Sequence, residues 1–274
     1  MNKGFSIVEK NSIKLISVDC INDTGIFNAY YSTGFGGVSD LPGGCSMNLN
    51  IFKRTIDCKE NSIKNFDLFC DAIKVPNGYN NLVAQHEVHS SIVRKVTKKD
   101  CKKDIFDVTQ YADGDGQITD DSIPLFVYAS DCATIMIADP VTGIYGTTHC
   151  GWKNSLNNTI NNWIGLFKQL GGNVKTAIAA IGPSLCQDCF EVDDDVRNLF
   201  LDSNPSFVKY MFKKGSKTHI DLNGINSELL VEEGIEPDNI HISGICNRTE
   251  YNLPSYRRDK GANGVMGGII FKKN

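Results

Sequence analysis

The stretch LFVYASDCATIMIADPVTGIYGTTHC, residues 125–150, sets the fold of this chain, because three of its segments are rich in β-branched, aromatic and other apolar residues. We predict strands at Leu125–Ala129, Thr134–Ala138 and Ile144–Thr148, since each has the length and composition typical of a buried strand. A proline and a glycine lie between the last two, as expected for a turn. Three neighbouring strands indicate a β-sheet at the centre of the chain.

Two amphipathic helices are predicted on either side of this centre, where apolar residues recur at steps of three and four. One spans Glu60–Ile73, and the other begins at Ser155 and stops at a pair of glycines. Further helices are predicted near residues 193–201 and 223–233. Further strands are predicted at Ser12–Val18, Phe27–Ser32, Ala177–Ile181, Ile242–Cys246 and Gly268–Phe271, with a hairpin turn at Asn22–Gly25 between the first two.

The length of 274 residues and the hydrophobic fraction of 41% allow a substantial core, in one large α/β domain or two small ones. Apolar segments are spaced evenly, and neither a repeat nor a proline-rich or glycine-rich linker divides them. We therefore expect one continuous α/β (α+β) domain, residues 1–274, with mixed sheets covered by helices. A coiled coil, a collagen-like fibre and a disordered chain are excluded.

The charge balance is nearly even, with 32 acidic and 28 basic residues and a formal net charge of -4. Such a chain has no general attraction for a polyanion, so nucleic acid is not expected as a partner. No run of eighteen apolar residues exists, and the first residues lead into charged ones instead of an apolar signal core. We expect a cytoplasmic protein without a membrane partner, its ten cysteines present as thiols.

Chemistry-bearing residues gather between Gln85 and Trp152, where three of the five histidines lie close to strand ends. The segments are QHEVHS at residues 85–90, SDC at 130–132 and HCGWK at 149–153. Two imidazoles and a thiolate are a suitable ligand set for zinc, with the fourth position left open for water or substrate. Because the segments are far apart in the chain, only a folded sheet could bring such ligands together.

Ordered motifs in this region resemble the YfiH-like laccase-domain proteins, once called multicopper polyphenol oxidases. The matching segments are Asp115–Thr119, Ser130-Asp131-Cys132, His149–Lys153, Ile181–Ser184, Gly36–Ser39, Phe190-Glu191-Val192 and Ser255–Asp259. They cover nearly the whole chain, and several short matches in order are more specific than any one of them. The resemblance implies a four-layer αββα sandwich.

The resemblance also implies a function: zinc-dependent purine nucleoside phosphorylase, with accompanying adenosine deaminase activity. The implied substrates are phosphate and a purine nucleoside, namely adenosine, inosine, guanosine or methylthioadenosine. His89, Cys132 and His149 match the family's zinc ligands, and His86 is the alternative first ligand. Copper can occupy such a site adventitiously, because affinity for divalent metals peaks at copper. We expect a monomer or a small homo-oligomer.

Several residues depart from the family's pattern. Glu87 stands where glutamine is usual, and it is our candidate for the acid/base that moves a proton. Arginines of the family are replaced by Gly34, Lys153 and Val265, which reduces the cationic groups expected to hold phosphate. Lys153, with the start of the following helix, is predicted to bind phosphate.

Arg257 and Arg258 are further candidates for binding phosphate, although arginine pairs are more often solvated or paired with carboxylates. Other features are interpreted as structural: Trp152 packs in the core, and Asp131 faces away from Cys132 because adjacent strand residues alternate. The pattern at 113–118 lacks the terminal carboxylates of a calcium loop, so calcium is rejected. Cys186-x-x-Cys189 is interpreted as an oxidisable thiol pair near the pocket, and His219 and His241 as structural histidines.

Three rival functions remain to be weighed. A multicopper oxidase needs more histidines than the five in this chain, so one subunit cannot build its oxygen-reducing cluster. A cysteine hydrolase would use Cys132 as nucleophile with His89 or His149 as base. A non-catalytic metal-binding partner protein is the third, because the missing arginines weaken the expected substrate site.

Overall fold

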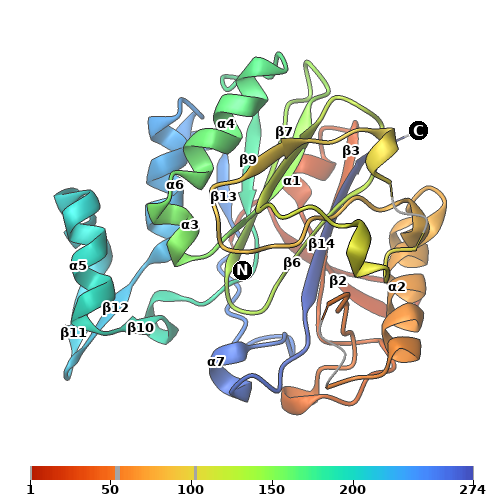
Figure 1. The fold of residues 1–274 in the computed structure, drawn as a ribbon, viewed down its shortest axis with the longest axis horizontal. Coiled ribbons are helices and arrows are strands. Elements are labelled where there is room, and N and C mark those ends of the chain that lie inside the picture. Colours follow the sequence, from red (N-terminus) through yellow and green to blue (C-terminus); the bar gives the residue numbers. More distant parts are fainter. Residues whose placement is uncertain (1, 53–55, 102–103, 274) are drawn as a thin grey trace.

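The computed structural model describes residues 2–52, 56–101 and 104–273, which form two large β-sheets packed face to face (Figure 1). The first sheet has five strands in the order β1-β2-β3-β14-β6, and every neighbouring pair is antiparallel. Its strands are β1 (Ser6–Lys10), β2 (Ile13–Ser17), β3 (Phe27–Ser32), β14 (Met266–Lys272) and β6 (Leu125–Ala129).

The second sheet has six strands in the order β13-β9-β7-β8-β5-β4. It is mixed: the edge pairs β13–β9 and β4–β5 are parallel, and the pairs between them are antiparallel. Its strands are β13 (Ile240–Ile242), β9 (Ile178–Ile181), β7 (Ala133–Ala138), β8 (Tyr145–Cys150), β5 (Gly116–Thr119) and β4 (Val93–Lys95).

Alternation along the strands divides the core into layers. In β6, Val127 and Ala129 pack between the two sheets, and Phe126 packs under α2 (Lys59–Ile73) on the outer face. In β7, Met136 points to the space between the sheets and Ile135 to the opposite face, which α4 (Thr159–Gln169) and α6 (Leu222–Glu232) cover. The predicted four-layer αββα sandwich is therefore confirmed.

A third, smaller sheet of order β10-β12-β11 lies to one side of the sandwich, beside α5 (Figure 1). It consists of β10 (Glu191–Val192), β11 (Met211–Lys214) and β12 (Lys217–Ile220), with α5 spanning Asp194–Ser203. Its separate core includes Phe200, Phe207 and Ile225. The remaining short helices are α1 (Asp19–Asn22), α3 (Trp152–Leu156), α7 (Tyr256–Asp259) and the 3-10 turns η1 (Pro42–Gly44), η2 (Gly78–Asn81), η3 (Lys98–Asp100), η4 (Val108–Gln110), η5 (Gln187–Cys189), η6 (Pro205–Tyr210) and η7 (Pro237–Asn239).

Three local predictions require correction. The helix expected to begin at Ser155 begins at Trp152 and is broken before α4, because Asn158 adopts a left-handed φ of 59°. The strand expected at Ile242–Cys246 ends at Ile242, since the chain turns away at Gly244, whose φ is 67°. The hairpin of β2 and β3 is antiparallel as predicted, but α1 occupies its connection.

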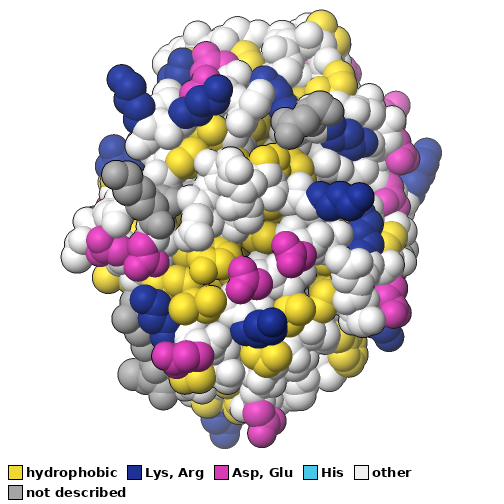
Figure 2. Space-filling view, turned by 90° about the vertical axis from the view of Figure 1, so that its right-hand side faces the viewer, with side chains coloured by type: hydrophobic (Ala, Val, Ile, Leu, Met, Phe, Trp, Pro, Cys, Tyr) yellow, Lys and Arg dark blue, Asp and Glu magenta, His cyan; other side chains and the backbone are white. Residues whose placement is uncertain are grey.

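Charges of both signs alternate over the face shown in Figure 2, which lies to the right in Figure 1. This distribution agrees with the nearly neutral formal charge of -4. Among the described residues, no helix combines the length and the apolar character that crossing a bilayer requires.

Candidate metal centre

Two neighbouring strands bring Cys132 and His149 to one edge of the mixed sheet. Cys132 immediately precedes β7. His149 is the next-to-last residue of β8 and lies opposite Thr134 in the antiparallel register. His89 comes from the loop that precedes β4. The fold therefore brings together side chains that are far apart in the chain, with 43 residues between Cys132 and His89.

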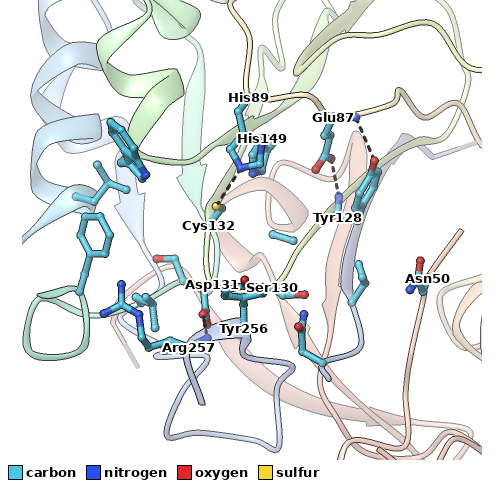
Figure 3. Close-up of a pocket in the computed structure, with 18 of the residues that line it drawn as sticks. Asn50, Glu87, His89, Tyr128, Ser130, Asp131, Cys132, His149, Tyr256 and Arg257 are labelled. Atoms are coloured by element: carbon cyan, nitrogen blue, oxygen red, sulfur yellow. Dashed lines mark hydrogen bonds between the residues drawn. The ribbon is translucent and has the colours of Figure 1, made fainter. Parts of the chain in front are cut away.

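The three side chains point toward one another (Figure 3). The Sγ atom of Cys132 lies 3.9 Å from Nε2 of His89, and one donor atom from each residue lies within 4.8 Å of the others. The rings of His89 and His149 meet edge to face with centroids 4.7 Å apart. This is the N₂S group predicted from the sequence, and His86, the alternative ligand, lies outside it.

Asp115 orients the group from behind, a role that sequence reasoning missed. Its carboxylate lies 2.9 Å from Nδ1 of His149, and both side chains are buried. A proton on Nδ1 satisfies this bond and leaves the other ring nitrogen free to bind a metal, which is the usual arrangement behind a metal-bound histidine.

The loop that carries His89 is fixed on the same carboxylate. The backbone N–H groups of His89 and Ser90 donate to Asp115 at 3.0 and 2.6 Å, and the Ser90 hydroxyl donates at 2.8 Å. This turn requires a left-handed backbone at His89, with φ 58°, which is unusual for a residue other than glycine. Asp115 thus couples the positions of His89 and His149.

The electrostatics of the group favour charged ligands. Burial raises the pKa of the Cys132 thiol, but His149 and His89 outweigh burial and lower that pKa to about 6. Burial raises the pKa of Asp115 as well, yet hydrogen bonds from His149 and Ser90 hold it at about 2. A thiolate and a carboxylate therefore face the imidazoles at neutral pH.

Glu87 lies beside this group and is held by Tyr128. The backbone N–H of Tyr128 donates to Oε1 of Glu87 at 3.1 Å, and the Tyr128 hydroxyl accepts the N–H of Glu87 at 3.1 Å (Figure 3). Burial raises the pKa of Glu87 to about 8, opposed by His149 and the Tyr128 amide. The raised pKa makes Glu87 a candidate to carry a proton near neutral pH.

A cavity of about 640 Å³ opens over the three ligands. Its lining includes Trp152, Leu185, Phe190 and Leu222, which belong to one apolar cluster, and the rings of Phe52 and Tyr128, whose centroids lie 5.4 Å apart. Trp152 also packs against the core of the small sheet, so it combines the predicted packing role with a place in the cavity lining. The volume and the aromatic lining suit an organic molecule with a planar ring.

Arg257 is the arginine that lines the cavity, and its position depends on Asp131. The Asp131 carboxylate accepts the backbone N–H of Arg257 at 2.7 Å, consistent with the predicted hydrogen-bonding role away from the metal ligands. The Arg257 guanidinium donates to the carbonyls of Cys189 and Glu191 at 3.3 and 3.2 Å.

The other predicted substrate-binding cations have different surroundings. Arg258 donates to the Leu253 carbonyl and pairs with Asp259 at 2.7 Å. Lys153 lies over the ring of Trp152, 5.6 Å from its centroid. Neither side chain belongs to the cavity lining. The N–H of Ser155 donates to the Gly151 carbonyl at 3.1 Å, so the helix start predicted there is not an unpaired anion site.

The remaining features of the sequence also find their places. Asp113 pairs with His86 at 2.9 Å on the surface, while Asp115 faces the histidines, so the two carboxylates of the apparent calcium loop separate. His219 is buried and stacks on Phe212 with ring centroids 5.0 Å apart.

Comparison with known proteins identifies similar sequences. A family model described as "Multi-copper polyphenol oxidoreductase laccase" matches residues 28–273. A purine nucleoside phosphorylase of Deinococcus radiodurans is 32% identical over 159 residues, which make up 58% of this chain and 61% of that protein. The purine nucleoside phosphorylase YlmD of Bacillus subtilis is 28% identical over 254 residues, 89% of this chain and 88% of that protein. Adenosine deaminase RL5, of an unknown prokaryotic organism, is 30% identical over 67% of this chain and 71% of that protein.

A similar fold is found in the crystal structure of the Bacillus licheniformis hypothetical protein YfiH. The TM-score is 0.88 at 25% sequence identity, and the match covers 99% of this chain and 100% of that chain. The similarity therefore extends over both large sheets and the small one.

Proposed function

Because this chain belongs to the family described as multi-copper polyphenol oxidoreductase laccase, as its motifs predicted, we propose that it is a zinc-dependent purine nucleoside phosphorylase. Its substrates are phosphate and adenosine, inosine, guanosine or methylthioadenosine, and it deaminates adenosine as a second reaction. The observation that carries the proposal is the convergence of His89, Cys132 and His149 under an aromatic cavity of about 640 Å³.

His89, Cys132 and His149 hold the zinc ion in this proposal. Two imidazoles and a thiolate are donors that zinc prefers, and three protein ligands leave one position open, as catalytic zinc sites require. Bound there, the ion supplies a Lewis acid at the floor of the cavity. Asp115 supports this role because it fixes the ring of His149 and the loop of His89 through one carboxylate. The small number of histidines argues against a multicopper oxidase, whose copper cluster needs more than the five that the chain contains.

Glu87 donates the proton that the leaving group gains in each reaction. In phosphorolysis the bond between C1′ of the ribose and the purine nitrogen breaks, a C1′–O bond to phosphate forms, and the leaving purine gains a proton. In deamination water adds at C6 and ammonia leaves with a proton. Glu87 lines the cavity together with the three residues, and the hydrogen bond that its Oε1 accepts from the Tyr128 amide keeps the carboxyl in one orientation.

The walls of the cavity bind the nucleoside and the anion. Trp152 and Phe190 offer aromatic surface to a purine. Arg257, whose side chain is about one third exposed (32%) and lies 3.9 Å from the Glu191 carboxylate, provides the positive charge for phosphate. Lys153 and Arg258 contact other groups and do not line the cavity, so they act only through the positive field that they add.

A turnover assay tests this function. Purified protein with one equivalent of zinc, adenosine and phosphate should release adenine with ribose 1-phosphate, or inosine with ammonia. Inosine and phosphate should then release hypoxanthine, which separates phosphorolysis from deamination. If the zinc-loaded protein forms none of these products, a non-catalytic metal-binding role replaces the proposal.

A second candidate, a cysteine hydrolase, is favoured by one observation: Asp115, His149 and Cys132 form a chain of carboxylate, imidazole and a thiol whose pKa is lowered to about 6. Alkylation separates the two candidates. In a hydrolase, alkylation of Cys132 in metal-free protein abolishes an activity that needs no zinc. In the phosphorylase, metal-free protein is inactive before alkylation, and zinc protects Cys132 from the reagent.

A further inference from the structure

A second group of donors lies apart from the His89–Cys132–His149 centre, in the wall between the cavity and the small sheet. The sulfur atoms of Cys186, Cys189 and Cys246 lie within 4.8 Å of one another. Cys189 and Cys246 are buried, with 8% and 3% of their surface exposed, and Cys186 is half-buried. The CxxC pair noticed in the sequence thus acquires a third cysteine from a segment about sixty residues later.

The backbone fixes this group. Cys186 is the N-cap of the turn η5 after β9 and Cys189 is its last residue, while Cys246 follows β13, the parallel neighbour of β9. A bridge between Ser184 and Cys246 continues that pairing beyond the strands. The convergence of the sulfurs therefore follows from the sheet rather than from a single loop.

Hydrogen bonds to sulfur favour thiolate at one member of the group. The backbone N–H of Cys186 donates to Sγ of Cys246 at 3.5 Å, and the N–H of Arg248 donates to the same sulfur. Such bonds stabilise the charged form, and thiolate is the form that binds metals.

We propose that Cys186, Cys189 and Cys246 form a second, structural metal site for a closed-shell, thiolate-seeking ion, Zn²⁺ or Cu⁺. Three sulfurs that each lie about 2.3 Å from one ion are roughly 3.8 Å apart, and the three sulfurs here lie within 4.8 Å of one another, so any movement needed to bind an ion is about 1 Å or less. A disulfide would use two of the cysteines and leave a buried thiol beside it. Binding releases the thiol protons to solvent and forms three metal–sulfur bonds, with no change of oxidation state.

The location of the three cysteines indicates what an ion bound there would do. Leu185 and Phe190, which surround the CxxC turn, line the cavity, and the Cys189 carbonyl accepts a hydrogen bond from Arg257. An ion bound by the three sulfurs would tie this wall to the segment after β13. The site thus stabilises the cavity wall and takes no part in the reaction.

Metal stoichiometry tests the proposal independently of the first centre. The Cys132→Ala chain is reduced, stripped with a chelator, and titrated with Zn²⁺ or with Cu⁺ under argon, and native mass spectrometry counts bound ions. We expect one equivalent that is lost in Cys132→Ala/Cys186→Ser and retained in Cys132→Ala/Cys20→Ser, whose half-buried Cys20 lies outside both groups. Binding of zinc, or of Cu⁺ alone, identifies the ion, and both results support the site.

Alkylation of the unsubstituted chain gives a second readout that does not depend on how well a variant folds. Metal should protect Cys186, Cys189 and Cys246 from iodoacetamide until chelator is added, while exposed Cys58 reacts throughout. Two results overturn the proposal: equal metal stoichiometry with and without Cys186, or protection without metal in a chain lighter by two hydrogen atoms, which is the signature of a disulfide. A chain without phosphorylase activity should still bind metal at Cys186, Cys189 and Cys246, so failure of the proposed function and failure of this site can be distinguished.

Discussion

The molecule contains two groups of side chains that could hold a metal ion, and their surroundings differ. His89, Cys132 and His149 combine nitrogen with sulfur, depend on a buried carboxylate, and face a cavity of about 640 Å³. The group of Cys186, Cys189 and Cys246 contains only sulfur, is supported by backbone N–H groups, and lies in the wall. A position beside a cavity, where substrate can reach the ion, is a property of catalytic metal sites, whereas the three sulfurs lie in the wall, where an ion would hold two segments together. Substitutions in the two groups should therefore have different consequences.

The largest difference is expected between Cys132→Ala and Cys186→Ser. Removal of Cys132 takes away one of three ligands, so zinc should be lost from this centre and kcat/KM for adenosine phosphorolysis should fall about 10³-fold or more. Cys186→Ser should keep that zinc and lower kcat/KM less than about tenfold, while its midpoint of thermal unfolding falls. Steady-state kinetics and metal analysis on both variants are the measurements. Equal losses of activity would remove the distinction between the two groups.

A smaller loss of activity is expected on substitution of Glu87, which lines the cavity with His89, Cys132 and His149. Glu87→Gln preserves the shape of the side chain and removes the transferable proton, so kcat should fall roughly 10²-fold while zinc content stays the same. Asp113→Asn, on an exposed carboxylate paired with His86, serves as the control and should leave kcat unchanged. A Glu87→Gln enzyme with full kcat would assign the proton to another group.

Asp115→Asn tests the buried carboxylate that supports the His89–Cys132–His149 group. Each oxygen of Asp115 accepts hydrogen bonds, and an amide would turn an N–H₂ group toward N–H donors from His149 or Ser90. We expect zinc affinity to fall about 10- to 100-fold, as for other partners of metal-bound histidines. Competition with a chromogenic chelator measures the affinity. Unchanged affinity would mean that the ligands hold their positions without Asp115.

The same comparison shows how far the sequence predicts the structure. β7 is apolar and β8 contains aromatic and β-branched residues, so the positions of both strands follow from composition, and the family resemblance implied the three residues that the fold brings together. β5 was not predicted, since Gln117 and Thr119 interrupt any apolar pattern although every residue of the strand is buried. The side-chain N–H groups of Gln117 donate to the Val83 and Phe126 carbonyls, which lie 34 and 9 residues away in the chain.

Long-range contacts explain the other residues that sequence reasoning missed. Asp115 lies 34 residues from His149, within a pattern that resembles a calcium loop, so its role appears only when β5 and β8 pair. Cys246 is separated in the chain from the pair Cys186 and Cys189 by the whole small sheet and α6. A break such as the one at Asn158 depends on a single left-handed residue that interrupts an otherwise continuous helical pattern.

Arg257 links the two groups, and the smallest predicted effect concerns this link. Its backbone N–H binds Asp131, the neighbour of Cys132, while its guanidinium binds the carbonyl of Cys189. Arg257→Ala should raise the KM for phosphate about tenfold and leave zinc content unchanged, because a single charge-assisted contact with an anion contributes of the order of 1.5 kcal/mol. Arg257→Lys keeps the charge and should recover part of the loss.

Lys153→Ala is the matched control for Arg257→Ala, since it also removes one positive charge near the cavity. Its ammonium lies over Trp152 and outside the lining, so the KM for phosphate should change less than about twofold. Equal changes in the two variants would mean that phosphate responds to the general field and not to a specific contact. A rise confined to Arg257→Ala, and enlarged when Cys186→Ser is added, would show that the sulfur group positions the arginine through the Cys189 carbonyl.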